Sequence, residues 1–524
     1  MRLALTLVGC LTLMQALAQI AQPARWEREL KFSEESYSLV SMKEEGIALL
    51  RSLDEYEHNK RKWELTLLDT LLQETWSTKL SIDGDYTFLG YEHTPSRLNL
   101  MFRQSEAIQL NAVVIDVDLQ SKEVQTSTVE FKLQIRLTHY TVAGRNCFFG
   151  GYVGMEPVLL VFDPIKKKNL IVPGFFLTET ELLDVRPNNN STVNVLLAQR
   201  ISGKKKLIFR TFDKNGSILI EDEIPIDEGK TILSGASSVL EHDEVLIAGS
   251  FAFNNNKQAS GIFSCLIDPF GEQPVQYTEF HQLQHFLDYL SDKKASKIRQ
   301  RATQREGYGK NPEYKTNITI HRIEEFNDGF ALFGESYLSS TSANNNYAYS
   351  NPYGNPYART GGIPYPYYST MGSRYYNNPY LYQTSTVSTD IRIVQAFTIG
   401  FSFKGNRVWD YTAPMGDLKA YTREQVSDFV VAADGIPHFL YKEENDLKFS
   451  NHGTDTLQTL EPKAIPIRLN NAFEESRPVD DQEGHVRQWY ADNFYVWGVT
   501  NIKDSRPAIP NRRVFFINKV ALQE

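Results

Sequence analysis

Residues 212–216, Phe-Asp-Lys-Asn-Gly, end one apolar run and lead into another. Asn215-Gly216 is a strong β-hairpin signal, and Asp213 stands at the first turn position, where its carboxylate can accept backbone N–H groups two residues on. An apolar residue followed by Asp recurs at Leu68-Asp69, Val117-Asp118, Phe162-Asp163, Phe212-Asp213 and Ile267-Asp268. The spacings of 49, 45, 50 and 55 residues predict a repeated β unit about fifty residues long.

Each of these hairpins is preceded by a strongly apolar run, and similar runs follow later in the chain. The eight runs are 47–50, 98–102, 148–153, 193–197, 245–251, 330–333, 438–441 and 494–499. Continuous apolar runs of this length are typical of strands that neighbouring sheets cover on both faces. We therefore predict that each run is the second, inner strand of a four-stranded unit.

The first segment of the mature chain has the character of an outer strand. Residues 25–30 are similar to the segments around Trp76 and Trp409, yet they precede the first full unit, while the last unit ends at 514–520 without a fourth strand. Placing residues 25–32 in the last unit closes a ring and removes an exposed sheet edge.

The period and the strand character resemble the β-propeller superfamily in the broad sense, over nearly the whole mature chain. The resemblance implies an all-β fold: a single β-propeller of eight, alternatively seven, four-stranded blades over residues 19–524, closed by the N-terminal strand. The chain carries no WD40, kelch or sialidase signature, so the resemblance carries over no active residues. The seventh unit, 424–467, is the weakest because its strands are short and polar.

Residues 1–18 read as a secretory signal peptide, with Arg2 before an apolar stretch and Ala16-Leu17-Ala18 as the cleavage site. An alternative takes Cys10 as a lipid-modified residue. No later segment is long and apolar enough to span a membrane. We expect an exported protein that is periplasmic, on the cell surface or secreted. Cleavage leaves Cys147 and Cys265, which we predict to be buried thiols rather than a disulfide.

A net charge of −9 over 524 residues provides no basic field for phosphates. We therefore expect no nucleic-acid partner.

Two insertions interrupt the repeat. In residues 281–315, the spacing of Phe280, Leu283, Leu287, Leu290 and Ile298 predicts a helix packed on the propeller. Basic side chains follow at Lys293, Lys294, Lys297, Arg299, Arg301 and Arg305; they are either a grip for an acidic partner or a solvated face. The binding candidates among them are Lys293, Lys294, Lys297 and Arg299. Blade topology places this insertion and the second one, 340–388, at the same end of the propeller.

The second insertion is of low complexity, with eleven Tyr, seven Asn and five Pro between Asn344 and Tyr382. Its tyrosines offer amphipathic contact surfaces for a protein or a glycan, as adaptable binding loops do. The binding candidates here are Tyr365, Tyr367, Tyr368, Tyr375 and Tyr376. The alternative is a tolerated surface expansion with no specific partner.

The sequence supplies no catalytic or cofactor motif. His281 and His285, with Asp288, have a spacing that metals use on a helix, but the set lacks a third strong ligand, and we assign no metal, cofactor or catalytic residue. We expect a non-enzymatic binding or scaffold protein of the cell envelope or exterior that uses the loop-rich propeller face. The alternative is a carbohydrate-active hydrolase or lyase with its site at the channel mouth of that face.

Overall fold

The structure is a computed structural model that describes residues 19–523 with internal gaps. The gaps are 32–36, 85, 105–108, 241–243, 255, 257, 268–273, 315, 327, 341–389, 421–424, 433–434, 451–461, 478, 480–483 and 507–508. The expected signal peptide and nearly all of the Tyr-rich insertion therefore lie outside the described residues.

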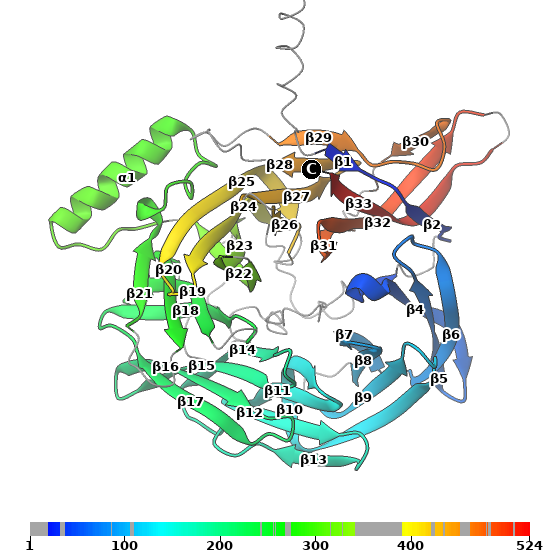
Figure 1. Cartoon of the computed structure of the whole chain (residues 1–524), viewed down its shortest axis with the longest axis horizontal. Helices are drawn as coiled ribbons and strands as arrows, with labels where there is room; N and C mark the ends of the chain where they lie inside the picture. The colour runs from blue at the N-terminus through cyan, green and yellow to red at the C-terminus, as the bar shows by residue number, and fades with distance from the viewer. Residues whose placement is uncertain are drawn as a thin grey trace, which may run out of the picture.

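The described chain is almost entirely antiparallel β-sheet, arranged as a ring (Figure 1). The first sheet contains β3 (Ser38–Ser41), β4 (Ile47–Glu57), β5 (Lys60–Leu68) and β6 (Glu74–Asp83). The next contains β7 (Tyr86–Thr94), β8 (Arg97–Gln104), β9 (Gln109–Asp118), β10 (Val124–Ala143), β11 (Asn146–Val153), β12 (Glu156–Asp163) and β13 (Lys168–Ile171). The third contains β14 (Thr180–Pro187), β15 (Val193–Ile201), β16 (Lys204–Phe212) and β17 (Ile218–Pro225).

The remaining sheets complete the ring. The fourth contains β18 (Lys230–Ser237), β19 (Val245–Phe253), β20 (Gly261–Ile267) and β21 (Gln276–Glu279). The fifth contains β22 (Asn317–Phe326), β23 (Gly329–Ser340), β24 (Asp390–Ser402) and β25 (Arg407–Ala420). The sixth contains β26 (Ser427–Val431), β27 (Pro437–Glu443), β28 (Asp446–Ser450) and β29 (Lys463–Pro466). The last contains β31 (Val486–Tyr490), β32 (Asn493–Asp504), β33 (Arg512–Gln523), β1 (Gln19–Ala21), β2 (Arg25–Glu29) and β30 (Glu474–Arg477).

Short helical segments lie between some strands of the described chain. They are the 3-10 turns η1 (Lys43–Glu45) and η2 (Phe280–Gln282) and the α-helix α1 (Asp292–Gly307). None of the helices in the described residues is long and apolar enough to cross a membrane.

The predicted repeat is confirmed strand by strand. Each of the eight apolar runs lies in the second strand of a four-stranded unit: β4, β8, β11, β15, β19, β23, β27 and β32. The turn Asp residues act as expected, since Asp213 Oδ1 accepts from the backbone N–H groups of Asn215 at 2.9 Å and Ser217 at 2.8 Å. Asp69, Asp118 and Asp163 accept backbone N–H bonds in the same way.

A bulge in the first strand of most units is a further mark of the repeat. The pairing of first and second strands shifts at Phe88/Gly90, Leu137/His139, Leu182/Asp184, Ile232/Ser234, Ile320/Arg322 and Gln488/Tyr490. A bulge adds one residue to one strand and bends it. The bulge therefore bends the first strand of each of these six units at a corresponding position.

The ring is closed by the N-terminal strand, as predicted. β2 pairs antiparallel with β33, with Trp26 opposite Ile517, and β1 continues the pairing with Gln19 opposite Gln523. The ring of Trp26 packs edge-on against Tyr37 of the first unit and Phe515 of the last. The first and last units are thus joined through this strand. The chain has a β-propeller fold.

The choice between seven and eight blades depends on β10. This strand pairs with β9 along Val124–Ile135 and with β11 along Arg136–Ala143. It serves both as the fourth strand of one unit and as the first strand of the next. Counted by hydrogen bonding, the described residues form seven sheets; if the shared sheet is counted as two units, the number becomes eight.

Buried polar side chains connect neighbouring units. Asp184 in β14 accepts hydrogen bonds from the backbone N–H and hydroxyl of Ser237 in β18, at 2.9 and 3.1 Å, and forms an ion pair with Arg186 at 3.0 Å. Between the fifth and sixth sheets, Glu335 accepts from the backbone N–H of Ser427 at 2.8 Å. Because these carboxylates are buried, their bonds hold the third sheet to the fourth and the fifth to the sixth.

Cys147 and Cys265 are both buried thiols, as predicted. Burial raises the pKa of each thiol to about 12. Both side chains are therefore protonated at neutral pH and pack as small apolar groups.

Candidate functional site

The helix of the first insertion begins later than the sequence pattern indicated. α1 starts at Asp292, after Ser291, whereas residues 283–290 form bends and turns. The backbone N–H groups of Gln284 and His285 donate to the carboxylate of Asp410 in β25, at 2.9 and 2.7 Å, so they do not take part in helical bonds. The prediction of a helix from 281 is wrong for this reason.

The apolar residues of the predicted stripe nevertheless pack on the propeller. Phe280, Leu283 and Leu287 are buried, while Leu290 and Ile298 are partly buried against the same cluster. Their three- and four-residue spacing reflects contact with the sheets rather than one helical face.

Arg299 holds α1 to the turn segment below it. Its guanidinium donates to the carbonyl oxygens of His281, Leu283 and Gln284 at 2.9, 2.6 and 2.7 Å. These bonds satisfy carbonyl groups that lie outside regular structure. Of the four predicted basic binding residues, Arg299 is thus engaged within the fold.

The other three predicted cations lie on the exposed side of the helix. Lys293, Lys294 and Lys297 are exposed, and Arg301 extends the same surface. The opposite side of α1 packs inward through Ile298 and the buried Ala302. In Figure 1 the helix lies at the rim of the ring, outside the sheets. We call this exposed surface of Lys293, Lys294, Lys297 and Arg301 the basic helix face.

The first insertion enters the fifth sheet and the second leaves it at the same end, as blade topology predicted. Asn317, where β22 begins after the first insertion, pairs with Tyr337 near the end of β23. Ser340 and Asp390, which flank the second insertion, pair with each other. The five tyrosines predicted to bind, Tyr365, Tyr367, Tyr368, Tyr375 and Tyr376, lie outside the described residues, so their role stays a prediction.

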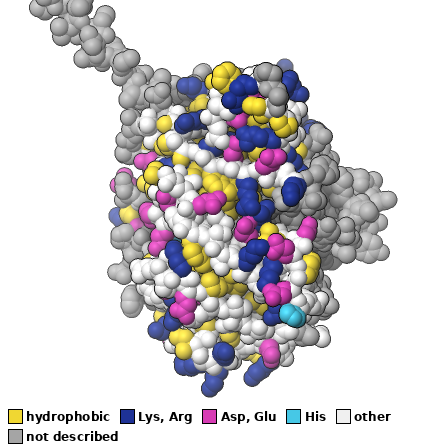
Figure 2. All heavy atoms as spheres, turned by 90° about the vertical axis from the view of Figure 1, so that its right-hand side faces the viewer, with side chains coloured by type: hydrophobic (Ala, Val, Ile, Leu, Met, Phe, Trp, Pro, Cys, Tyr) yellow, Lys and Arg dark blue, Asp and Glu magenta, His cyan; other side chains and the backbone are white. Residues whose placement is uncertain are grey.

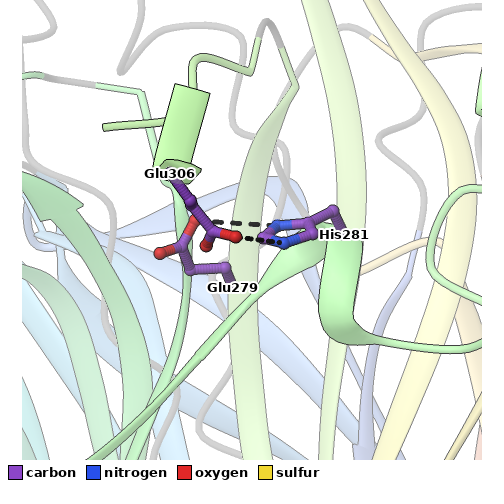
Figure 3. Close-up of side chains that lie close together, drawn as sticks. All are labelled: Glu279, His281 and Glu306. Carbon is purple, nitrogen blue, oxygen red and sulfur yellow. Dashed lines mark ion pairs between the residues drawn. The ribbon is translucent and has the colours of Figure 1, made fainter. Parts of the chain in front are cut away.

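A cluster of two carboxylates and one imidazole lies where α1 returns to the propeller (Figure 3). Glu279 ends β21, His281 follows in η2, and Glu306 is in the last turn of α1. His281 Nε2 lies 3.2 Å from Glu306 Oε2, and its Nδ1 lies 3.7 Å from Glu279 Oε2. One candidate ligand atom from each side chain lies within 4.8 Å of the others.

The two carboxylates of the cluster repel each other. Burial, together with the nearby Glu306, raises the pKa of Glu279 to about 7. The Oε2 atom of Glu279 is buried and accepts no hydrogen bond from the described residues. The imidazole of His281 is only 8% exposed. Such an arrangement binds protons or a cation.

The metal geometry considered from the sequence is not formed. His285 lies beside Asp288, with Nδ1 and Oδ2 2.9 Å apart, and this hydrogen bond raises the pKa of His285. His281 instead faces Glu279 and Glu306. Because η2 and the turns after it are not one helix, the four-residue spacing does not place both imidazoles on one face. The sequence offered no signal for Glu306, which is 25 residues from His281.

Comparison with known proteins finds only distant structural likenesses. No protein-family model matches the chain, and no curated protein matches it. Among solved structures, the polysaccharide lyase Uly1 is similar with a TM-score of 0.40 and 8% identity, over 83% of this chain and 89% of that chain. Dihydro-heme d1 dehydrogenase NirN gives a TM-score of 0.41 and 10% identity, over 96% of this chain and 78% of that one.

The β-propeller domain of the Trilobed protease from Pyrococcus furiosus gives a TM-score of 0.32 and 7% identity, over 81% of this chain and 96% of that domain. The likenesses are all distant. The propeller assignment rests on the order of the sheets and their closure by β2.

Proposed function

We propose that this propeller is an exported binding or scaffold protein of the cell envelope or exterior. Its binding surface is the end of the ring from which the two insertions emerge, and its partner is an anionic protein or glycan. The observation that carries the proposal is the basic helix face, which the fold holds in one orientation on the insertion that meets the same end of the fifth sheet as the Tyr-rich insertion.

The orientation of α1 is fixed from two directions. Ala295 and Ile298 pack on the apolar cluster, Ala302 is buried, and Arg299 donates to three carbonyl groups of the segment beneath the helix. A helix held in this way presents Lys293, Lys294 and Lys297 without a loss of backbone conformational entropy on binding. This pre-organisation distinguishes the surface from a flexible charged loop.

The charge on α1 also differs from that on the side of the ring seen in Figure 2. Figure 2 views the side that lies to the right in Figure 1 and shows Lys and Arg interspersed with Asp and Glu. The first sheet lies on this side, where Lys79 pairs with Glu55 at 2.6 Å. Beside the four cations of the basic helix face lies one exposed acid, Asp292, in the first turn of α1. Positive charge not matched by acids favours an anionic partner.

Export is part of the proposal because of residues 1–18. Cleavage after Ala18 leaves Gln19 as the first residue, which is also the first residue of β1. The closing strands β1 and β2 therefore remain in the mature chain after cleavage.

The Tyr-rich insertion can be removed without breaking the sheet. Ser340 and Asp390 face each other across β23 and β24, so an Asn-Gly turn can replace residues 341–389 as a two-residue hairpin. In a pull-down from envelope extracts, we expect the wild-type protein to recover partners that the turn variant loses. A second variant, with Tyr365, Tyr367, Tyr368, Tyr375 and Tyr376 all changed to Ser, keeps the length of the segment and should show the same loss.

Thermal unfolding of both variants serves as the control, since β23 and β24 remain paired. If the turn variant recovers every partner in wild-type amounts, the binding role of the insertion is wrong. Turnover of a polysaccharide panel by the wild-type protein would favour the enzyme alternative instead.

A further inference from the structure

We propose that Glu279, His281 and Glu306 form a binding site for a divalent transition-metal ion, with the chemistry of Zn²⁺, that fastens helix α1 to the propeller. The site is distinct from the basic helix face, and the proposal does not depend on which partner the propeller binds.

In one tautomer of His281 two hydrogen-bond acceptors face each other at this site, and in the other tautomer Nε2 carries the proton between them. The hydroxyl of Tyr314 lies 2.7 Å from His281 Nδ1 and also accepts from the backbone N–H of His281 at 3.4 Å. In the tautomer in which Nδ1–H donates to this hydroxyl, Nε2 presents a lone pair to Glu306 Oε2 at 3.2 Å. Two acceptors at that distance need a proton or a cation between them.

The carboxylate of Glu279 also favours a bound cation. Its Oε2 atom is buried, accepts no hydrogen bond from the described residues and lies on the same side as the other two ligand atoms (Figure 3). A buried carboxylate oxygen without a donor is costly in free energy. A bound cation satisfies this oxygen, the imidazole nitrogen and Glu306 together.

The surroundings of His281 resemble those of a metal ligand. A metal-bound imidazole commonly donates its second N–H to a neighbouring oxygen, which fixes the tautomer and the ring orientation. The hydroxyl of Tyr314, 2.7 Å from Nδ1, supplies that oxygen. The ring of Tyr314 also packs edge-on against Phe280, at 5.3 Å between centroids. The position of the hydroxyl is thus fixed by the apolar cluster.

The ligand set indicates the class of metal. One imidazole nitrogen and two carboxylate oxygens suit Zn²⁺, which binds both groups, better than Ca²⁺, which prefers an all-oxygen shell. The Glu306 side chain is 34% exposed, so water can complete a four-coordinate shell. Since Glu306 is on α1 while Glu279 and His281 are on the propeller, the ion links the two.

The test is calorimetric titration of untagged, chelator-treated mature protein with Zn²⁺, and with Ca²⁺ for comparison. We expect one equivalent of Zn²⁺ to bind. Each of Glu279→Gln, His281→Asn and Glu306→Gln should weaken the affinity at least tenfold, whereas Ca²⁺ should bind far more weakly. The matched control is Glu313→Gln, which removes a carboxylate of the same insertion that pairs with Arg305 outside the cluster.

A second readout reports on the link between helix and ring. α1 contains trypsin sites at Lys293, Lys294 and Lys297, so Zn²⁺ should slow cleavage within the helix of the wild-type protein and leave the Glu306→Gln variant unaffected. Glu306 is at the surface, and its variant should fold normally. The proposal is overturned if no stoichiometric Zn²⁺ binding occurs, or if Glu306→Gln binds Zn²⁺ as tightly as the wild type.

Discussion

Replacing Asp184 by Ala is expected to destabilise the protein by about 3–5 kcal/mol, because the change leaves the buried guanidinium of Arg186 without its counter-charge. The side chains of Asp184 and Arg186 are only 1% and 0% exposed. The same carboxylate accepts from the backbone N–H and hydroxyl of Ser237 in the next sheet. The variant therefore loses both an ion pair and a contact between two units. Chemical denaturation measures the resulting change in the free energy of unfolding.

Two further variants separate the ion pair from a general loss of packing. Changing Asp184 to Ala and Arg186 to Met together removes both charges and should cost less than Asp184→Ala alone. Glu55→Ala breaks the exposed pair with Lys79, where the side chains are 57% and 53% exposed, and should change stability very little. If Asp184→Ala lowers the free energy of unfolding no more than Glu55→Ala does, the structural role of the buried pair is contradicted.

Removing residues 19–30 is expected to open the ring and to lower stability by more than about 5 kcal/mol, beyond the range of most single core substitutions. The deletion removes β2 from β33 and exposes a strand edge. It also removes Arg25, which is 3% exposed and donates to Asn518 Oδ1 at 2.8 Å. Glu27, which pairs with Arg512 at 2.6 Å, is lost as well.

A peptide of residues 22–31 provides the complementary experiment. Added to the shortened protein, it should bind the open edge of β33 by strand addition and restore much of the lost thermal stability. Deleting β1 alone, residues 19–21, is the control and should have a small effect. Unchanged stability of the protein without residues 19–30 is incompatible with closure by β2.

The sequence was sufficient for the fold because the repeat is encoded locally. The eight apolar runs and the turn Asp residues each act within one or two strands, so their spacing shows the units directly. The outer-strand character around Trp26 likewise indicated its place beside β33. By contrast, the sharing of β10 between two units follows from hydrogen bonding along a continuous strand, which spacing does not reveal.

The candidate site could not be predicted in the same way, because it depends on contacts between distant residues. Asp410 accepts hydrogen bonds from the backbone N–H groups of Gln284 and His285, and this prevents the helix from starting at these residues. The delayed α1 then brings Glu306 back to His281. Both effects depend on how the insertion packs against β25 and η2, so a pattern of apolar residues indicated only that the segment docks.

Charge reversal at each end of the propeller tests most directly whether the propeller binds through its insertion-bearing end. One variant changes Lys293, Lys294 and Lys297 to Glu, and the matched variant changes the exposed Lys166, Lys167 and Lys168, near the β12–β13 turn at the other end, to Glu. Each is used to capture partners from envelope extracts, and recovery is quantified by mass spectrometry. We expect the helix variant to lose the partners that the wild-type protein recovers and the β12–β13 variant to keep them. Equal recovery by the helix variant and the wild type would contradict binding through this end.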